Sequence, residues 1–215
     1  PNKKIEDLVR FFHVYRLKYN PTARLLLVGS QRGFEDYVSA VDDLLATLGT
    51  PDVHLIGHVS NEELTALYDV ADLFLSASEH EGFCVPLIEA FYKRVPVIAF
   101  AATAVPATMD GGGVLYDHKD PRHVASIMNA MVSDGTLQNE ILRAQDAALE
   151  RLLCRDFAET LLGFVEQVRQ APSLEPPRVT LDFWHQFDRL LETEELRQYR
   201  PSAFEALPKA SSVRD

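Results

Sequence analysis

Residues 71–90 read ADLFLSASEHEGFCVPLIEA and contain an apolar run, a polar turn with a glycine, and the start of a helix. The apolar run predicts a buried strand over 73–75. Pro86 stands where proline is favoured in the first turn of a helix, and Glu89 falls in the same turn. Two carboxylates, Glu81 and Glu89, therefore bracket one strand–loop–helix junction.

Such a junction suits an anion. The first backbone N–H groups of a helix are unpaired, and the helix dipole is positive at that end, so a phosphate is stabilised there. Carboxylates on either side of a phosphate can accept hydrogen bonds from hydroxyl groups. This order of groups fits a nucleotide-sugar, in which a diphosphate joins a sugar to a ribose. The spacing alone also fits two solvated glutamates, because the chain has 32 acidic residues.

Composition narrows the class of protein. The chain has 215 residues, 47% of them hydrophobic, enough for one large domain or one domain with an appendage. A net charge of −11 argues against a nucleic-acid partner.

No apolar run is long enough for a membrane span and no secretory signal opens the chain, which predicts a cytoplasmic location without direct membrane insertion by this part. Peripheral membrane attachment through residues outside this chain stays open. Cys84 and Cys154 are too few for a disulfide framework or a metal cluster.

Apolar strands alternate with amphipathic helices along the chain. This alternation predicts an α/β fold with a doubly wound parallel sheet, which binds ligands beyond the carboxyl ends of its strands. The expected strands are 24–28, 53–56, 73–75, 95–100 and 114–116, and the expected helices are 5–19, 37–48, 61–70, 86–93, 121–131, 137–153 and 157–170. The stretch 101–113 is expected to be a loop of small residues.

A change in composition near residue 171 divides the chain. We expect residues 1–170 to form a nucleotide-sugar-binding domain, and residues 171–215 to form a linker, a crossover-type helix and a disordered tail. The helix is expected from an apolar stripe of Phe183, Trp184, Phe187, Leu190 and Leu191. Because residues 1–4 run directly into a helix, we also expect a strand, and more, to precede the chain.

The string Glu-Gly-Phe-x-x-Pro-Leu-x-Glu-Ala at 81–90, followed by Val-Pro-Val-Ile-Ala at 95–99, resembles the E-x7-E segment of the retaining GT-B glycosyltransferases usually called family 4. The resemblance covers about residues 2–164. It implies a Rossmann-like, donor-binding C-terminal half of an enzyme whose N-terminal half is missing here. Such an enzyme transfers a hexosyl group from a nucleotide-diphospho-sugar to an acceptor, such as a glycan or lipid-linked glycan.

The resemblance also implies roles for single residues. Glu81 would bond hydroxyls of the transferred sugar, and Lys3 would offset charge on the leaving diphosphate, so these two are the catalytic candidates. Glu89 would accept hydrogen bonds from the ribose. The remaining donor-binding candidates act through their backbone: Gly29, Val59, Gly82, Phe83, Cys84, Val85 and Leu87.

Other interpretations stay open beside this one. The chain could belong to another GT-B enzyme, such as a nucleotide-sugar epimerase, or be a non-catalytic nucleotide-sugar-binding module. Lys3 could be a solvated lysine, and Gly29 could serve a tight turn. We expect no metal and no cofactor, because no Asp-x-Asp motif is present to hold a cation on the diphosphate. Cys84 is expected to be a small packing residue, and Arg94, at a helix end where the family has glycine, to need a left-handed backbone.

Overall fold

The computed structural model describes residues 2–171, 197–198 and 204–205. The apolar stripe of residues 183–191, most of the linker and the tail at 207–215 lie outside these residues. The predicted elements are found in the predicted order, with one addition. They are α1 (Ile5–Lys18), β1 (Leu25–Val28), α2 (Glu35–Leu48), β2 (Val53–Gly57), α3 (Asn61–Asp69), β3 (Phe74–Ser76), α4 (Val85–Tyr92), β4 (Val97–Phe100), α5 (Val105–Met109), β5 (Val114–Tyr116), α6 (Pro121–Ser133), α7 (Gly135–Leu153) and α8 (Phe157–Gln170).

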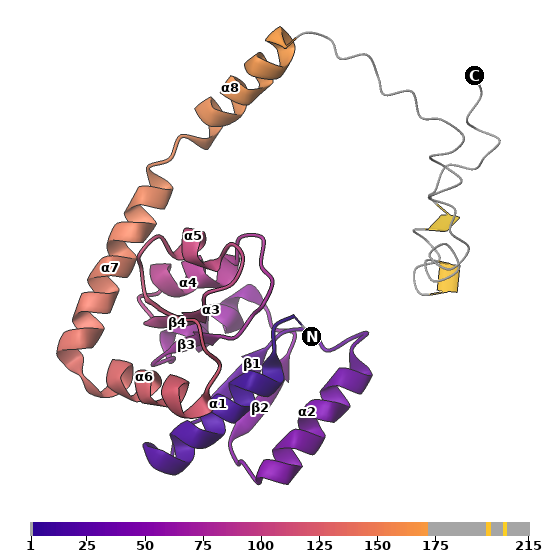
Figure 1. The fold of residues 1–215 in the computed structure, drawn as a ribbon, viewed down its shortest axis with the longest axis vertical. Coiled ribbons are helices and arrows are strands. Elements are labelled where there is room, and N and C mark those ends of the chain that lie inside the picture. The colour runs from indigo at the N-terminus through magenta and orange to yellow at the C-terminus, as the bar shows by residue number, and fades with distance from the viewer. Residues whose placement is uncertain (1, 172–196, 199–203, 206–215) are drawn as a thin grey trace. The chain divides into compact units, whose positions relative to one another are not determined.

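The strands pair in parallel, which confirms the α/β prediction, but they form two ladders instead of one (Figure 1). β1 pairs with β2, with Leu25 opposite Val53. The other ladder has the order β3-β4-β5, with Phe74 opposite Val97 and Ile98 opposite Val114. Among the described residues, β1 and β3 therefore each have a strand neighbour on one edge only.

Burial follows this pairing. β4 has a strand on each side, and Val97, Ile98 and Ala99 are fully buried. β1 alternates instead, with Leu26 38% and Val28 41% exposed. An unbroken apolar run such as β1 is typical of strands covered on both faces, so the exposure of one face was not predicted.

Two clusters of apolar side chains form the core. One lies between α1, α6 and the strands, where the ring of Phe11 meets that of Tyr116 edge to face at 5.9 Å. The other surrounds α4 and includes Leu87, Phe91 and Met109. α4 thus has its apolar face anchored in the core, and its N-terminal end is held in place at the loop after β3.

Local signals explain most helix boundaries. Ser60 and Glu63 form the predicted capping box at the start of α3. The prediction that residues 101–113 form a loop is wrong in part, because this stretch contains the short helix α5, with Pro106 in its first turn. α4 begins at Val85, one residue before the predicted start. Arg94 adopts the left-handed backbone that its position requires, with φ of 56°.

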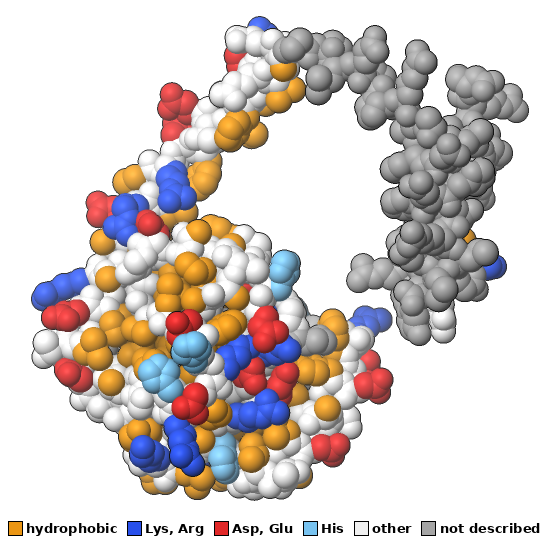
Figure 2. All heavy atoms as spheres, in the orientation of Figure 1, with side chains coloured by type: hydrophobic (Ala, Val, Ile, Leu, Met, Phe, Trp, Pro, Cys, Tyr) orange, Lys and Arg blue, Asp and Glu red, His pale blue; other side chains and the backbone are white. Residues whose placement is uncertain are grey.

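The chain divides into two compact units, residues 1–156 and 157–215. α8 lies in the second of these units, and the domain boundary near residue 170 stays a prediction. Hydrophobic side chains along α8 are exposed (Figure 2): Phe157, Leu161, Leu162, Phe164, Val165 and Val168. The same view shows positive and negative side chains interspersed on the first unit.

Candidate functional site

The start of α4 offers unpaired backbone donors. Cys84 precedes the helix with a left-handed backbone (φ 65°, ψ 64°). The N–H groups of Gly82, Phe83, Cys84 and Val85 donate to no acceptor among the described residues. Phe83 and Val85 are exposed as well. Consecutive free amides at the positive end of a helix dipole can bind an anion such as a phosphate.

Leu87 is less available than its neighbours. Its backbone N–H donates to the carbonyl oxygen of Cys84 at 3.0 Å, and its side chain is fully buried in the cluster around α4. The residue thus fixes the first turn of the helix from inside. A contact of its main chain with a ligand would have to share that hydrogen bond.

The two catalytic candidates meet directly. The Nζ atom of Lys3 contacts Oε1 of Glu81 as an ion pair, although 78 positions separate them in sequence. The side chain of Glu81 is only 10% exposed, that of Lys3 53%. Burial opposes the charge of Glu81, but the hydrogen bond and the positive charge of Lys3 act against this effect, and the pKa of the carboxyl lies below its ordinary value. Glu81 is therefore a carboxylate at neutral pH.

Asn2 explains how Lys3 reaches the loop. The carbonyl oxygen of Asn2 accepts a hydrogen bond from the backbone N–H of Glu79 at 2.9 Å, and its side-chain amide donates to the carbonyl of His80 at 3.2 Å. The hydroxyl of Ser78 also donates to the Asn2 carbonyl, at 3.2 Å. The N-terminal segment is thus fastened along the loop that carries Glu81.

A second group of charges holds the outer side of this loop. Glu79 pairs with Lys119 at 2.9 Å and with Lys4 at 3.1 Å, and Lys119 also pairs with Asp7 at 3.0 Å. The Nζ atom of Lys119 lies 4.6 Å from the centre of the Phe100 ring. Hydrogen bonds from Lys119 and Lys4 lower the pKa of Glu79. Sequence reasoning gave Lys119 no role, because it comes from a distant loop after β5.

Thr103 is another residue that sequence reasoning did not single out for the site. Its Oγ1 atom accepts a hydrogen bond from the backbone N–H of Glu81 at 2.9 Å and donates one to the carbonyl oxygen of Glu81 at 3.0 Å. Thr103 belongs to the loop between β4 and α5. The loops after β3 and β4 thus meet at Glu81.

Glu89 has a different neighbour. The hydroxyl of Tyr68, on α3, donates to Oε2 of Glu89 at 3.1 Å and lies 3.3 Å from the carbonyl oxygen of Pro86. Burial and the adjacent Glu89 carboxylate raise the pKa of Tyr68, so its hydroxyl keeps its proton. Glu81 and Glu89 are therefore held separately, one by the N-terminal segment and the other by α3.

Cys84 has the environment of a packing residue, as predicted. It is 8% exposed and belongs to the apolar cluster around α4. Burial, together with the negative charge of Glu81, raises the pKa of its thiol to about 11. The proximity of a helix start does not overcome these two effects, so the thiol stays protonated at neutral pH.

Gly29 and Val59 lie at the ends of the other ladder. Gly29 follows β1, has φ of 148° and open space where a side chain would be, and its N–H donates to the carbonyl of Gly57 at 2.9 Å. Val59 is half-buried just before the capping residue of α3. Both lie after the carboxyl end of a strand, where the sequence predicted a ligand.

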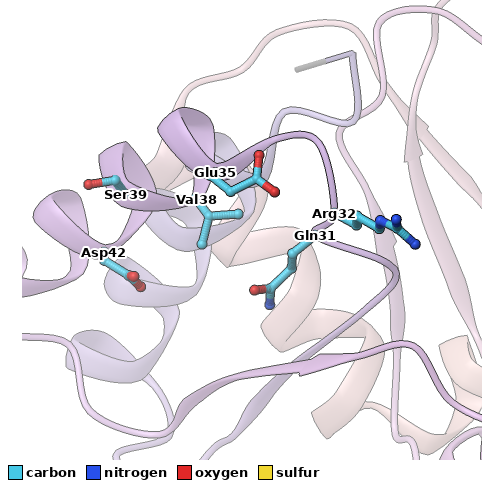
Figure 3. Close-up of a pocket in the computed structure, with 6 residues that line it drawn as sticks. All are labelled: Gln31, Arg32, Glu35, Val38, Ser39 and Asp42. Atoms are coloured by element: carbon cyan, nitrogen blue, oxygen red, sulfur yellow. The ribbon is translucent and has the colours of Figure 1, made fainter.

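The loop after β1 opens into a hollow of about 450 Å³ where it meets α2 (Figure 3). Its lining contains one guanidinium and two carboxylates, which makes it a poor site for a diphosphate. No residue of the loop before α4 contributes to it, so we treat it as separate from the candidate site. The lining residues are Gln31, Arg32, Glu35, Val38, Ser39 and Asp42.

Neither a metal centre nor a membrane span is found among the residues that the structure describes. No group of three or more His, Cys, Asp or Glu side chains could hold a metal ion in that part of the chain. None of its helices combines the length and the apolar character needed to cross a bilayer. Binding without a metal stays a prediction.

Solved structures resemble the fold. HepE from Anabaena, determined with UDP and glucose, superposes with a TM-score of 0.65 at 25% identity, covering 76% of this chain and 46% of HepE. The C-terminal domain of the group 1 glycosyl transferase LpcC from Francisella tularensis superposes with a TM-score of 0.61 at 23% identity, covering 70% of this chain and 79% of that domain. The resemblance to GT-B C-terminal domains is thereby confirmed.

Sequence relatives point to the same family. O-antigen chain mannosyltransferase B of Escherichia coli is 30% identical over 137 residues, covering 62% of this chain and 35% of the relative. D-inositol 3-phosphate glycosyltransferase of Corynebacterium kroppenstedtii is 32% identical over 96 residues, covering 43% of this chain and 21% of that relative. The chain thus spans about a third of the first relative and about a fifth of the second. The family described as glycosyl transferases group 1 matches residues 1–146. The chain therefore belongs to the group 1 glycosyl transferases.

Proposed function

We propose that this chain is the donor-binding part of a retaining glycosyltransferase. The enzyme would transfer a hexosyl group from a nucleotide-diphospho-sugar to an acceptor such as a glycan or lipid-linked glycan. The observation that carries the proposal is the Lys3–Glu81 pair beside the free amides at the start of α4. Relatives such as HepE, solved with UDP-glucose, support a donor of this kind.

In this proposal the diphosphate binds at the amides of Gly82, Phe83, Cys84 and Val85. Glu89 lies inside the helix, beyond this turn, and accepts hydrogen bonds from the ribose. Glu81 lies before the turn and accepts hydrogen bonds from the transferred sugar. The order of the groups along the chain matches the order of sugar, diphosphate and nucleoside in the donor.

Lys3 changes partner when the donor binds. Without a donor, its ammonium group neutralises the largely buried Glu81 carboxylate. The diphosphate is a stronger and more charged acceptor, so Lys3 turns to it and Glu81 is released to the sugar hydroxyls. As the bond to the sugar breaks, negative charge grows on the leaving diphosphate, and Lys3 with the helix amides stabilises that charge.

The acceptor site would come from an N-terminal half of a longer protein. This chain spans about a third of the length of the first relative, which supports a longer protein.

Calorimetry tests donor binding. The chain should bind one of UDP, GDP and ADP, and the matching sugar conjugate, without transferring sugar to an added acceptor. Absence of binding to all three nucleotides would contradict the proposal, and so would transfer by this chain alone. The remaining alternatives separate in the longer protein: an epimerase would convert the donor sugar without an acceptor, and a non-catalytic module would bind the donor without any product.

A further inference from the structure

Thr103 has a backbone conformation that its residue type disfavours. Its φ is 46°, in the left-handed region, where a β-branched side chain is a marked outlier. Such conformations persist only where surrounding contacts hold them, and they gather at functional sites. Thr103 is also exposed, so burial of an apolar side chain does not explain its conformation.

Among the described residues, the side-chain hydrogen bonds of Thr103 are all with Glu81. The Thr103 hydroxyl acts as both acceptor and donor toward Glu81: it accepts from the Glu81 N–H at 2.9 Å and donates to the Glu81 carbonyl oxygen at 3.0 Å. The two peptide groups flanking the Cα atom of Glu81 are thereby fixed. The direction of its Cα–Cβ bond, and so the starting point of its carboxylate, is fixed with them.

The opposite side of the loop is fixed independently. Asn2 bonds to Glu79 and His80, and Lys119 pairs with Glu79. Glu81 follows these residues and has no backbone hydrogen bond to the N-terminal segment among the described residues. Without Thr103, Lys3 would still pair with the carboxylate of Glu81, but the backbone of Glu81 would have no hydrogen-bond partner among the described residues.

We propose that Thr103 is a positioning residue, which holds the backbone of Glu81 so that its carboxylate stays beside Lys3 and faces the donor sugar. The part concerning the sugar rests on the proposed function; the part concerning Glu81 does not. The left-handed backbone of Thr103 is the cost of bringing its hydroxyl to both polar groups of Glu81.

Three substitutions separate positioning from folding. Thr103→Val keeps the β-branched shape and removes the hydroxyl. Thr103→Ser keeps the hydroxyl and removes a methyl group. Thr103→Gly removes the hydroxyl but suits the left-handed backbone, so its melting temperature should equal or exceed that of the Val variant. Thr108→Val, at a buried threonine of α5, is the control.

The first readout needs no donor. We expect amide exchange at Glu81 to be at least tenfold faster in the Val and Gly variants, and the NMR-measured pKa of the Glu81 carboxyl to rise toward its ordinary value. The Ser variant and the control should match the wild type within about twofold. Unchanged amide exchange and an unchanged Glu81 pKa in Thr103→Val would overturn the proposal. It would also be overturned if exchange and pKa across the variants correlated with their melting temperatures and not with the presence of the hydroxyl group.

The second readout is donor binding by calorimetry. The Val and Gly variants should bind the bare nucleoside diphosphate like the wild type and lose at least tenfold in affinity for its sugar conjugate. Equal losses for both ligands would refute positioning toward the sugar. If the wild type bound no nucleotide, the proposed function would fail, while the exchange and pKa measurements would still decide whether Thr103 positions Glu81.

Discussion

Gln145 supplies the stability prediction that the structure supports most fully. This α7 side chain is fully buried; its Oε1 accepts a hydrogen bond from the N–H of Val97 and its Nε2 donates to the carbonyl of Val95, each at 2.9 Å. Both backbone groups belong to buried residues at the entry to β4. A single amide therefore connects α7 to the strand that pairs with β3, the strand before the Glu81 loop.

Gln145→Leu keeps a similar volume and removes both hydrogen bonds. Two buried backbone groups then lose their partners, and each unsatisfied group costs about 1–3 kcal/mol. We therefore expect the free energy of unfolding to fall by about 2–6 kcal/mol, the sum of the two costs. Urea unfolding followed by circular dichroism measures this loss.

Gln138→Leu is the matched control, because this glutamine is only half-buried on the same helix. It should change the free energy of unfolding by less than about 0.5 kcal/mol, as surface substitutions usually do. A loss for Gln145→Leu no larger than that of the control would refute the reasoning. It would mean that water or a shifted backbone satisfies Val95 and Val97.

Three further predictions concern the site. Cys84 should resist iodoacetamide at pH 8 while the exposed Cys154 reacts, because the Cys84 thiol is buried and its pKa is raised to about 11. Mass spectrometry of the labelled peptides measures both reactions, and equal labelling of the two cysteines would contradict this prediction. The lowered pKa of Glu81 stabilises the fold above the ordinary carboxyl value of 4.5, and this stabilisation is lost as the pH falls through the lowered pKa of the folded state. The free energy of unfolding should thus fall below pH 4.5 less steeply in Glu81→Gln than in the wild type, and identical slopes would refute the assigned pKa direction. Nucleotide affinity should be similar with EDTA and with Mg²⁺, and a tenfold loss with EDTA, about 1.4 kcal/mol, would show that a metal takes part.

Much of the fold follows from local sequence signals. The Ser60–Glu63 capping box, the glycine stop at Gly49 and the proline in the first turn of α4 each act within a few residues, so sequence reasoning found them. The start of α4 followed within one residue from the same kind of signal, but Glu89, expected in the first turn of this helix, lies beyond that turn because the helix begins at Val85.

Contacts between distant segments could not be read from the sequence. Thr103 and Lys119 reach the Glu81 loop from the loops after β4 and β5, and no local signal in the sequence indicates that either residue contacts this loop. The exposed face of β1 was missed for a related reason: an apolar run indicates a strand, but its burial depends on which elements cover it. The Lys3–Glu81 pair was predicted as two roles at one site, and its direct contact came from the structure.

One titration series tests the central claim, which is that the donor lies along α4 with its nucleoside at Glu89 and its sugar at Glu81. Wild type, Glu89→Gln and Glu81→Gln would each be titrated calorimetrically with the best-bound nucleoside diphosphate and with its sugar conjugate. A charged hydrogen bond to a hydroxyl contributes roughly 1.5–3 kcal/mol. Glu89→Gln should therefore reduce the binding free energy of both ligands by about that amount, and Glu81→Gln should reduce only that of the sugar conjugate. Equal losses for both variants against the bare diphosphate, or no loss in either, would contradict the account.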